Sequence, residues 1–369
     1  DFVWNDLNMN GIQDLNEPGV GGGTEMLLDQ NMHLGDSTVT GENGFYAYNN
    51  LLPGTYFVMF IAPDRYDITI QNAGDEDTLD WVAVSDGDHS AFTGYESTET
   101  DAHVRRWARA DDRLLVVLDR TPFYAESGGQ VGDTGELIFP KMTLPVRDTV
   151  RRGDAIVHVI EEPEGLDPDV LFAEAARARI DANRRADIQR NHTATHLLHA
   201  ALRDVLGTHV AQAGSLVAPD RLRFDFSHFQ PMTAEEIRAV EEQVNREILG
   251  DAPVETGFTT LEEALASGAM ALFGEKYGDR VRQVVVPGYS RELCGGTHVG
   301  ATGEVGPFLV VGEQAVAAGT RRVEALTGTA AQAAVRQSRD ALDRVASRLQ
   351  TPRESVEEKI ETLLAERAE

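Results

Sequence analysis

Four residues have the types and the spacing needed to hold one metal ion. His192 and His196 stand four positions apart on an expected helix over residues 187–207, so both side chains lie on one helix face. Cys294, the only cysteine of the chain, precedes His298 by four residues, and the glycine pair between them allows a tight turn. Three imidazole nitrogens and one thiolate form a ligand set that suits zinc. The spacing therefore predicts a zinc site built from His192, His196, Cys294 and His298.

A pair of histidines at this spacing is by itself a weak signal, and the cysteine with its nearby histidine is what favours a shared metal ion. His199 lies on the same expected helix, where it is either a core residue or a supporting partner of a ligand. No metal-binding spacing is seen for His33, His89, His103, His158, His209 and His228. Four protein ligands are typical of a structural zinc, whereas a catalytic zinc keeps one position open. The sequence leaves both roles of the zinc open.

A second metal-binding pattern lies near the N-terminus. Residues 6–17 fit the twelve-residue calcium loop, with Gly11 at the sharp turn. The ligands expected from this pattern are Asp6, Asn8, Asn10, the Ile12 carbonyl, Asp14 and Glu17. No helix is expected before the loop, because Val3 and Trp4 belong to a strand-like run, and the alternative is a polar turn without an ion. Residues 72–77 are a candidate source of further calcium carboxylates.

The chain is strongly acidic, and its charge is unevenly distributed. The 369 residues carry a formal net charge of −28, which argues against a broad phosphate-binding surface. Residues 1–101 hold 19 acidic side chains and one basic side chain, Arg65. Arginines gather at 147–152, 178–190 and 280–291, where they form either solvated faces or RNA contacts. No stretch approaches the roughly 18 apolar residues that a membrane helix needs. The chain begins with aspartate and shows no signal peptide, so a fragment or a processed piece is expected.

The change in composition along the chain predicts a multidomain fold. Residues 1–101, with short strand-like runs between Gly, Asn, Asp and Pro, are typical of an all-β sandwich. Residues 102–168 contain several expected strands and a glycine-dense turn, which predict a small β-barrel. Residues 169–325 mix helical and strand patterns and predict an α+β domain. Residues 326–369 are expected to form a trailing helical segment.

Particular residues mark the expected ends of elements. Thr233 can cap a helix that runs to about Leu249, and Glu236 completes a capping box. Strands are expected near 253–258, 282–287 and 305–311. From Ala325 onward the chain reads mostly as helix, with a break at 351–352. The last segment is amphipathic and charged, as in a longer helix or coiled coil.

Several of these segments together resemble a known family. The stretches NHTATHLLH at 191–199 and ELCGGTHV at 292–299 are similar to the editing core of alanyl-tRNA synthetase. Further similar stretches follow the order of that family at 206–210, 222–228, 269–278 and 318–325. Residues 121–130 resemble the family's segment just before the editing domain. The resemblance covers roughly residues 112–369, and no stretch resembles the aminoacylation domain.

The resemblance implies both a site and an activity. It implies zinc at the four residues named above, an amino-acid pocket shaped by Thr195 and Gln212, and hydrolysis of Ser- or Gly-tRNA(Ala) in the cytoplasm, with the tRNA acceptor end as partner. A pocket that hydrogen-bonds the serine hydroxyl would reject alanine. Alternatively, Thr195 bonds back to its own helix and Gln212 is simply exposed. Arg223, Lys276 and Arg321 are candidates either for phosphate contacts or for structural ion pairs.

The first hundred residues resemble a different family. Residues 3–17, 44–46 and 52–56 are similar to the B-type repeats of serine-aspartate-repeat surface proteins, which are extracellular β-sandwich modules that bind calcium. The similarity fades after Asp80. Two functions from different classes are therefore weighed: an aminoacyl-tRNA deacylase carried by residues 103–369, and a calcium-binding surface or adhesion module with a structural zinc domain. A third reading is an artificial fusion of the two parts.

Overall fold

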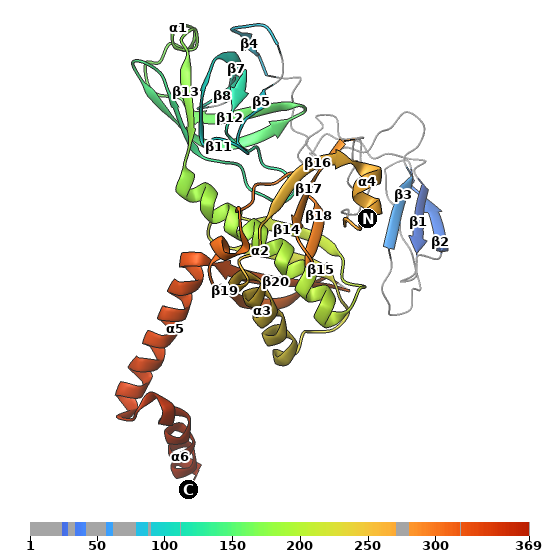
Figure 1. The fold of residues 1–369 in the computed structure, drawn as a ribbon, viewed down its shortest axis with the longest axis vertical. Coiled ribbons are helices and arrows are strands. Elements are labelled where there is room, and N and C mark those ends of the chain that lie inside the picture. The colour runs from blue at the N-terminus through green and yellow to red at the C-terminus, as the bar shows by residue number, and fades with distance from the viewer. Residues whose placement is uncertain are drawn as a thin grey trace. The chain divides into compact units, whose positions relative to one another are not determined.

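The structure is a mixed α/β fold with several sheets (Figure 1). The computed structural model describes residues 24–28, 34–41, 57–61, 79–87, 90–110, 112–270, 280–317 and 319–368. The chain divides into two compact units, the first comprising Asp1–Ala125 and Gly132–Ile180 and the second Glu126–Val131 and Asp181–Glu369. The four-segment division expected from the sequence stays a prediction.

The first unit is built on an eight-stranded antiparallel sheet. In spatial order its strands are β4 (Val82–Ala83), β7 (Val104–Ala110), β8 (Arg113–Leu118), β12 (Ala155–Glu161), β11 (Thr143–Arg152), β10 (Gly135–Ile138), β13 (Ala176–Ile180) and β6 (Glu99–Ala102). Two further short strands pair in parallel and a single helical turn follows: β5 (Ala91–Phe92), β9 (Arg120–Thr121) and α1 (Pro168–Leu171). Because β4 and β6 are the two ends of the strand order, the part of the chain that is described holds no closed barrel. The expected small barrel is not confirmed.

A period of two in burial explains how this sheet forms its core. In β13, Ala176, Ala178 and Ile180 are buried, whereas Arg177 and Arg179 are exposed on the other face. The buried face joins a cluster that includes Trp107, Leu114, Phe123, Phe139 and Phe172. The alternation of apolar and charged residues along the strand therefore corresponds to the buried and exposed faces of the sheet.

His158, one of the histidines without metal-binding spacing, is a core residue of this sheet. Its side chain is fully buried, its Nδ1 donates to the Val116 carbonyl at 2.9 Å, and its Nε2 accepts from the Thr121 hydroxyl at 2.8 Å. Burial disfavours the charged ring and lowers the pKa of His158 to about 4. The imidazole therefore stays neutral near pH 7, and both of its nitrogens are engaged.

One antiparallel three-stranded sheet is described within the first 61 residues. Its order is β2 (Leu34–Val39), β1 (Thr24–Leu28) and β3 (Phe57–Ile61). β3 lies in the part of the chain where short strand-like runs were expected. The two-sheet sandwich is not confirmed by these strands. The calcium loop at 6–17 and the carboxylates at 72–77 lie outside the described residues.

The second unit packs helices against a four-stranded antiparallel sheet. The sheet runs in the order β14 (Gln212–Val217), β15 (Leu222–Ser227), β20 (Thr320–Thr327) and β19 (Phe308–Ala317). Two helices, α2 (Ala182–Leu206) and α3 (Ala234–Leu249), share a core with it that includes Leu197, Leu198, Phe224, Phe226, Val240, Val244 and Val323. β20 continues past Ala325, where helix was expected, because Val323, Ala325 and Thr327 alternate inward against β15 and β19.

A smaller sheet and three more helices complete the second unit. They are β16 (Glu255–Thr260), β17 (Arg280–Val286), β18 (Ser290–Leu293), α4 (Leu261–Ala266), α5 (Gly328–Leu349) and α6 (Val356–Ala368), with 3-10 turns η1 (Thr302–Val305) and η2 (Arg353–Ser355). The capping box predicted for α3 is confirmed: Thr233 Oγ1 accepts from the Glu236 N–H at 3.2 Å, and the Glu236 carboxylate accepts from the Thr233 N–H at 2.7 Å. The expected break near 351–352 separates α5 from α6. Within the described part, no helix has the length and hydropathy needed to span a membrane.

Candidate metal centre

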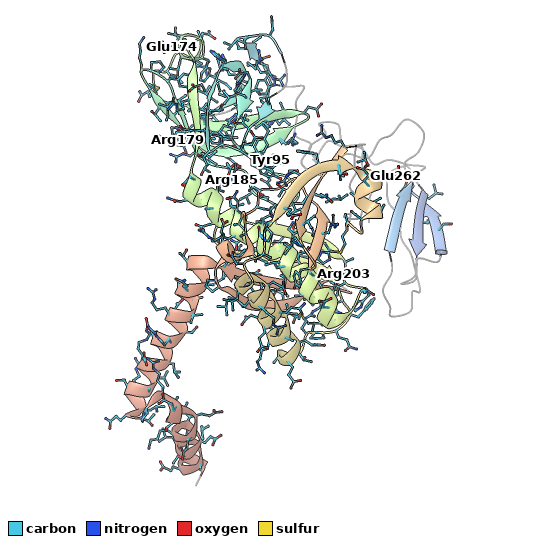
Figure 2. The ribbon with its side chains drawn as sticks, viewed as in Figure 1. Tyr95, Glu174, Arg179, Arg185, Arg203 and Glu262 are labelled. Atoms are coloured by element: carbon cyan, nitrogen blue, oxygen red, sulfur yellow. The ribbon has the colours of Figure 1, made fainter. Side chains whose placement is uncertain are left out.

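The helix α2 carries two of the predicted ligands and is unusually buried. Asp181 caps its N-terminus by accepting from the backbone N–H groups of Asn183 and Arg184. Figure 2 marks Arg185 and Arg203 near the two ends of the helix. Residues 191–202 between them are all buried. Polar side chains in this stretch must therefore find partners inside the protein.

The other two predicted ligands lie on the loop that follows β18. The Cys294 N–H donates to the Arg282 carbonyl at 3.0 Å. In return, Arg282 Nη1 donates to the carbonyls of Cys294 at 2.9 Å and Gly296 at 2.8 Å. The backbone of Gly296 approaches α2 so closely that a Cβ there would lie 1.9 Å from Cε1 of His192. These contacts fix the shape of the loop and hold it against the helix.

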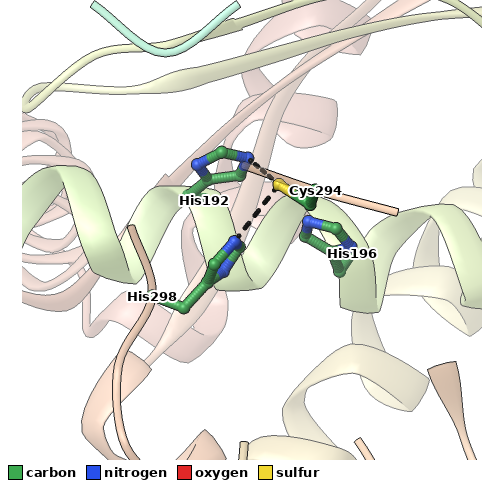
Figure 3. Close-up of side chains that lie close together, drawn as sticks. All are labelled: His192, His196, Cys294 and His298. Atoms are coloured by element: carbon green, nitrogen blue, oxygen red, sulfur yellow. Dashed lines mark hydrogen bonds between the residues drawn. The ribbon is translucent and has the colours of Figure 1, made fainter. Parts of the chain in front are cut away.

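The four predicted ligands converge, although a long stretch of chain separates the two pairs (Figure 3). Their ligand atoms all lie within 4.8 Å of one another. Cys294 Sγ is 3.4 Å from Nε2 of His192 and 3.4 Å from Nε2 of His298. Tetrahedral zinc with ordinary bond lengths has ligand atoms roughly 3.4–3.7 Å apart. The two distances from Cys294 match this spacing, and the donor set suits zinc.

Cys294 and His298 have the protonation states that a metal site needs. Burial alone would raise the pKa of the Cys294 thiol, but the neighbouring imidazoles of His192 and His298 outweigh it and hold this pKa well below its usual value. Burial lowers the pKa of His298 to about 3. A thiolate and a neutral imidazole are the forms that bind zinc. Burial would lower the pKa of His196, but Glu292 and Cys294 outweigh it and raise this pKa to about 10, so His196 must release a proton when a metal ion binds.

Each of the three imidazoles meets a different oxygen at its Nδ1 atom. The pairs are His192 with Gln130 Oε1 at 2.7 Å, His196 with Glu292 Oε2 at 3.0 Å, and His298 with Thr193 Oγ1 at 3.2 Å. Of these oxygens, the amide oxygen of Gln130 can only accept, so it keeps the proton of His192 on Nδ1 and leaves the lone pair on Nε2. Nε2 is the atom that His192 and His298 direct at the thiolate.

Glu292 is a buried carboxylate between two histidines of α2. Its Oε1 accepts from His199 Nδ1 at 3.0 Å, and its Oε2 lies 3.0 Å from His196 Nδ1. Burial alone would raise the pKa of Glu292, but the charge on His196 and the hydrogen bonds from both rings lower it to about 2. The carboxylate therefore stays ionised and orients His196 and His199 together.

The two residues expected to shape an amino-acid pocket have partners within the protein. Thr195 is buried, and its Oγ1 donates to the Asn191 carbonyl at 2.8 Å, which is the back-bonded geometry weighed as an alternative. Gln212 is half-buried on β14, and its Nε2 donates to Ser215 Oγ at 3.4 Å. The pocket roles of both residues stay predictions.

Of the basic residues considered either for phosphate contacts or for structural ion pairs, Arg321 forms a largely buried ion pair. Arg321 Nε lies 2.6 Å from Glu313 Oε1, and Arg321 Nη2 lies 2.8 Å from Glu313 Oε2. Arg223 Nε is 3.9 Å from Asp225. Lys276 lies outside the described residues. Phosphate contact stays a prediction for all three basic residues.

Gln130 and Glu292 contact metal-site histidines, and the sequence reasoning missed both. A signal existed for Glu292, because Ser290, Glu292 and Cys294 alternate with a period of two and so share one face of the β18 segment. No local pattern points to Gln130, which lies 62 positions from the histidine it contacts. Only the folded chain reveals that second contact.

Comparisons with known proteins place both halves of the chain among described families. Residues 1–106 match the model of the SdrD B-like domain. Residues 72–184 match the model of class II (A) tRNA synthetases, and residues 281–324 match the threonyl and alanyl tRNA synthetase second additional domain. The first two matches overlap over residues 72–106. The C-terminal part is thus similar to domains of class II tRNA synthetases.

The relatives with similar sequences indicate a narrower class than the family models do, because they carry the name alanine–tRNA ligase. That of Gluconobacter oxydans is 48% identical over 297 residues, which are 75% of this chain and 33% of the relative. That of Chlorobaculum tepidum is 51% identical over 268 residues, 70% of this chain and 30% of the relative. That of Thermus thermophilus is 50% identical over 291 residues, 74% of this chain and 32% of the relative. The chain spans about a third of the length of these relatives, and the resemblances inferred for both of its halves are confirmed.

Proposed function

We propose that the second unit binds zinc at His192, His196, Cys294 and His298 and hydrolyses mischarged Ser-tRNA(Ala) or Gly-tRNA(Ala). The observation that carries this proposal is the convergence of three imidazoles and one thiolate in a chain similar to alanine–tRNA ligases. The substrate is an ester between an amino acid and the terminal ribose of tRNA. The activity proposed is hydrolysis of this ester.

The proposed chemistry divides between the ion and the chain. Bound zinc would supply Lewis acidity toward the ester. The chain's own part is to orient the rings. Gln130 Oε1 keeps the proton of His192 on Nδ1, and Glu292 and Thr193 lie beside the Nδ1 atoms of His196 and His298. Four protein ligands are typical of a closed structural site, so catalysis requires one of them to yield its position or the shell to expand. The structural alternative is a zinc that only ties the loop after β18 to α2.

Selection against alanine is proposed to rest on Thr195 and Gln212. The Thr195 hydroxyl donates its proton to the Asn191 carbonyl. Its oxygen lone pairs therefore remain available to accept a hydrogen bond from a serine hydroxyl. Alanine offers no such donor and would leave the pocket's polar atoms unpaired, which disfavours its binding. Arg223, Lys276 and Arg321 are the proposed contacts for the acceptor-end phosphates of the tRNA partner.

Removing the metal tests the proposed enzyme directly. Full-length protein incubated with seryl-tRNA(Ala) is expected to release serine, and prior treatment with a zinc chelator is expected to reduce the rate to that of uncatalysed hydrolysis. One equivalent of zinc added back is expected to restore the rate. The measurement is the fraction of tRNA that stays charged over time, with alanyl-tRNA(Ala) as the control substrate. Turnover unaffected by chelation would contradict the proposal.

The match of residues 1–106 to the SdrD B-like domain supports a second, separate function. We propose that Asp6, Asn8, Asn10, Ile12, Asp14 and Glu17 bind calcium and stabilise an N-terminal surface module. Calcium is then expected to raise the lower melting transition of the full chain, since an ion that binds only the folded form stabilises it. Glu17→Gln removes the bidentate ligand position and is expected to abolish the shift, whereas Glu25→Gln, outside the loop, is the control. An unchanged melting profile with calcium excludes this function.

A further inference from the structure

Gln130 is a fully buried side chain that contacts two segments of the metal centre. Its Oε1 is 2.7 Å from Nδ1 of His192 and accepts from the Thr297 N–H at 2.9 Å. Its Nε2 donates to Thr297 Oγ1 at 3.0 Å. Thr297 stands between Cys294 and His298 on the loop. One amide group therefore links the helix that carries His192 to the loop that carries the other two ligands.

A tight turn delivers Gln130 to this position. Ser127 and Gln130 exchange backbone hydrogen bonds of 3.2 and 3.0 Å across Gly128 and Gly129, whose φ angles of 58° and 82° fall in the left-handed region that favours glycine. The turn docks on β14, where the Val217 N–H donates to the Gly129 carbonyl at 2.7 Å. Gly129 also lies against β14 so closely that a Cβ would be 2.3 Å from Ser215 Oγ. Both glycines therefore allow the turn that places Gln130.

The hydrogen bonds around Gln130 determine the tautomer of His192. The Thr297 N–H can only donate, so the Gln130 atom 2.9 Å from it must be the amide oxygen. The same oxygen is 2.7 Å from His192 Nδ1, which must therefore be the protonated nitrogen. The lone pair is left on Nε2, which lies 3.4 Å from Cys294 Sγ. A backbone group of the loop thereby decides which nitrogen of a helix residue faces the ion.

We propose that Gln130 is a positioning residue of the zinc centre, which fixes the tautomer and the ring orientation of His192. The inference rests on the metal site proposed above and adds a residue from the Glu126–Val131 segment to it. Gln130 touches neither ion nor substrate, and it acts through His192. Outer partners of metal-bound histidines typically change metal affinity by about 10- to 100-fold when they are lost.

Two substitutions of Gln130 in the full chain distinguish the proposed hydrogen-bonding role from a role in which the side chain only fills the core. Gln130→Met keeps the length of the side chain but removes the acceptor, and it is expected to weaken zinc binding by about 10- to 100-fold. Gln130→Glu keeps an oxygen for both His192 and Thr297, and its zinc affinity is expected to stay within about fivefold of wild type. Gln243→Met makes the same change at a glutamine of α3 that contacts Asp204, and it serves as the control.

The measurements are the zinc dissociation constant by competition with a chromophoric chelator and the visible absorption bands of the cobalt-loaded protein. The bands of Gln130→Met are expected to change in intensity and those of Gln130→Glu to resemble wild type. Equal affinity in wild type and Gln130→Met overturns the role of Gln130 alone. Loss in Gln130→Glu as large as in Gln130→Met also overturns it, even if Gln130→Met folds poorly. A wild type that takes up no zinc overturns the metal centre itself and this role with it.

Discussion

Replacing Cys294 with alanine is expected to cause the largest loss of zinc binding and of seryl-tRNA(Ala) hydrolysis. The thiolate is one of four proposed ligands, and structural zinc sites bind with roughly 10–16 kcal/mol in all, so one ligand is expected to contribute on the order of 3 kcal/mol. A loss of this size corresponds to about a 100- to 1,000-fold weaker affinity. The pKa of Cys294 lies well below its usual value, so the wild-type group is already a thiolate that binds zinc without an opposing proton.

The measurements are zinc stoichiometry, zinc affinity and the rate of serine release, with circular dichroism to show that the fold persists. His209→Ala is a suitable control, because His209 contacts His228 and lies outside the cluster. Undiminished hydrolysis by folded Cys294→Ala would exclude zinc from the chemistry. Lost zinc binding combined with normal hydrolysis would assign the ion a structural role.

Substituting Gly296 with alanine is expected to be nearly as damaging, for a steric reason. A Cβ at this position would lie 1.9 Å from His192 Cε1, 2.4 Å from His192 Nδ1 and 2.9 Å from Gln130 Oε1. The ring cannot retreat freely, because His192 is buried and its Nδ1 is hydrogen-bonded. Either the ring or the loop must move, and a misplaced ligand is expected to weaken zinc binding at least 100-fold, on the order of 3 kcal/mol.

The neighbouring glycine offers a matched control for this substitution. A Cβ on Gly295 would meet nothing within 4 Å, so Gly295→Ala makes the same chemical change in open space. Zinc affinities of the two variants, measured side by side, are expected to differ by at least 100-fold, with Gly295→Ala close to wild type. Similar affinities in the two variants would show that the contact between loop and helix is not maintained in solution.

The sequence was sufficient to predict a cluster of His192, His196, Cys294 and His298 that could hold a metal ion, because the spacing within each pair is local. His192 and His196 follow the helical repeat, and Cys294 and His298 flank a glycine turn. The capping box at Thr233 is equally local and was predicted to the residue. Patterns between residues within four positions of one another can be recognised in a single sequence, because helix and turn geometry place those residues close together.

Contacts between residues far apart in the sequence could not be predicted from the sequence. Arg321 was a candidate either for phosphate contact or for a structural ion pair, and it pairs with Glu313 across β19 and β20. The register that opposes Arg321 to Ala315 brings Glu313 within reach, and no spacing in the sequence indicates that register. Gln130 was missed for the same reason. It lies in a tight turn before β10, and nothing in the local sequence indicates that this turn belongs to the second unit.

The excursion of Glu126–Val131 into the second unit has a consequence for how such a protein evolves. Each unit is interrupted in sequence by part of the other, so a recombination event that copies one contiguous block cannot transfer a complete unit without also copying part of the other. A transplanted block that starts at Asp181 would retain all four ion-binding residues while losing the amide beside His192. Selection for a working centre should therefore keep the two stretches of gene inherited together.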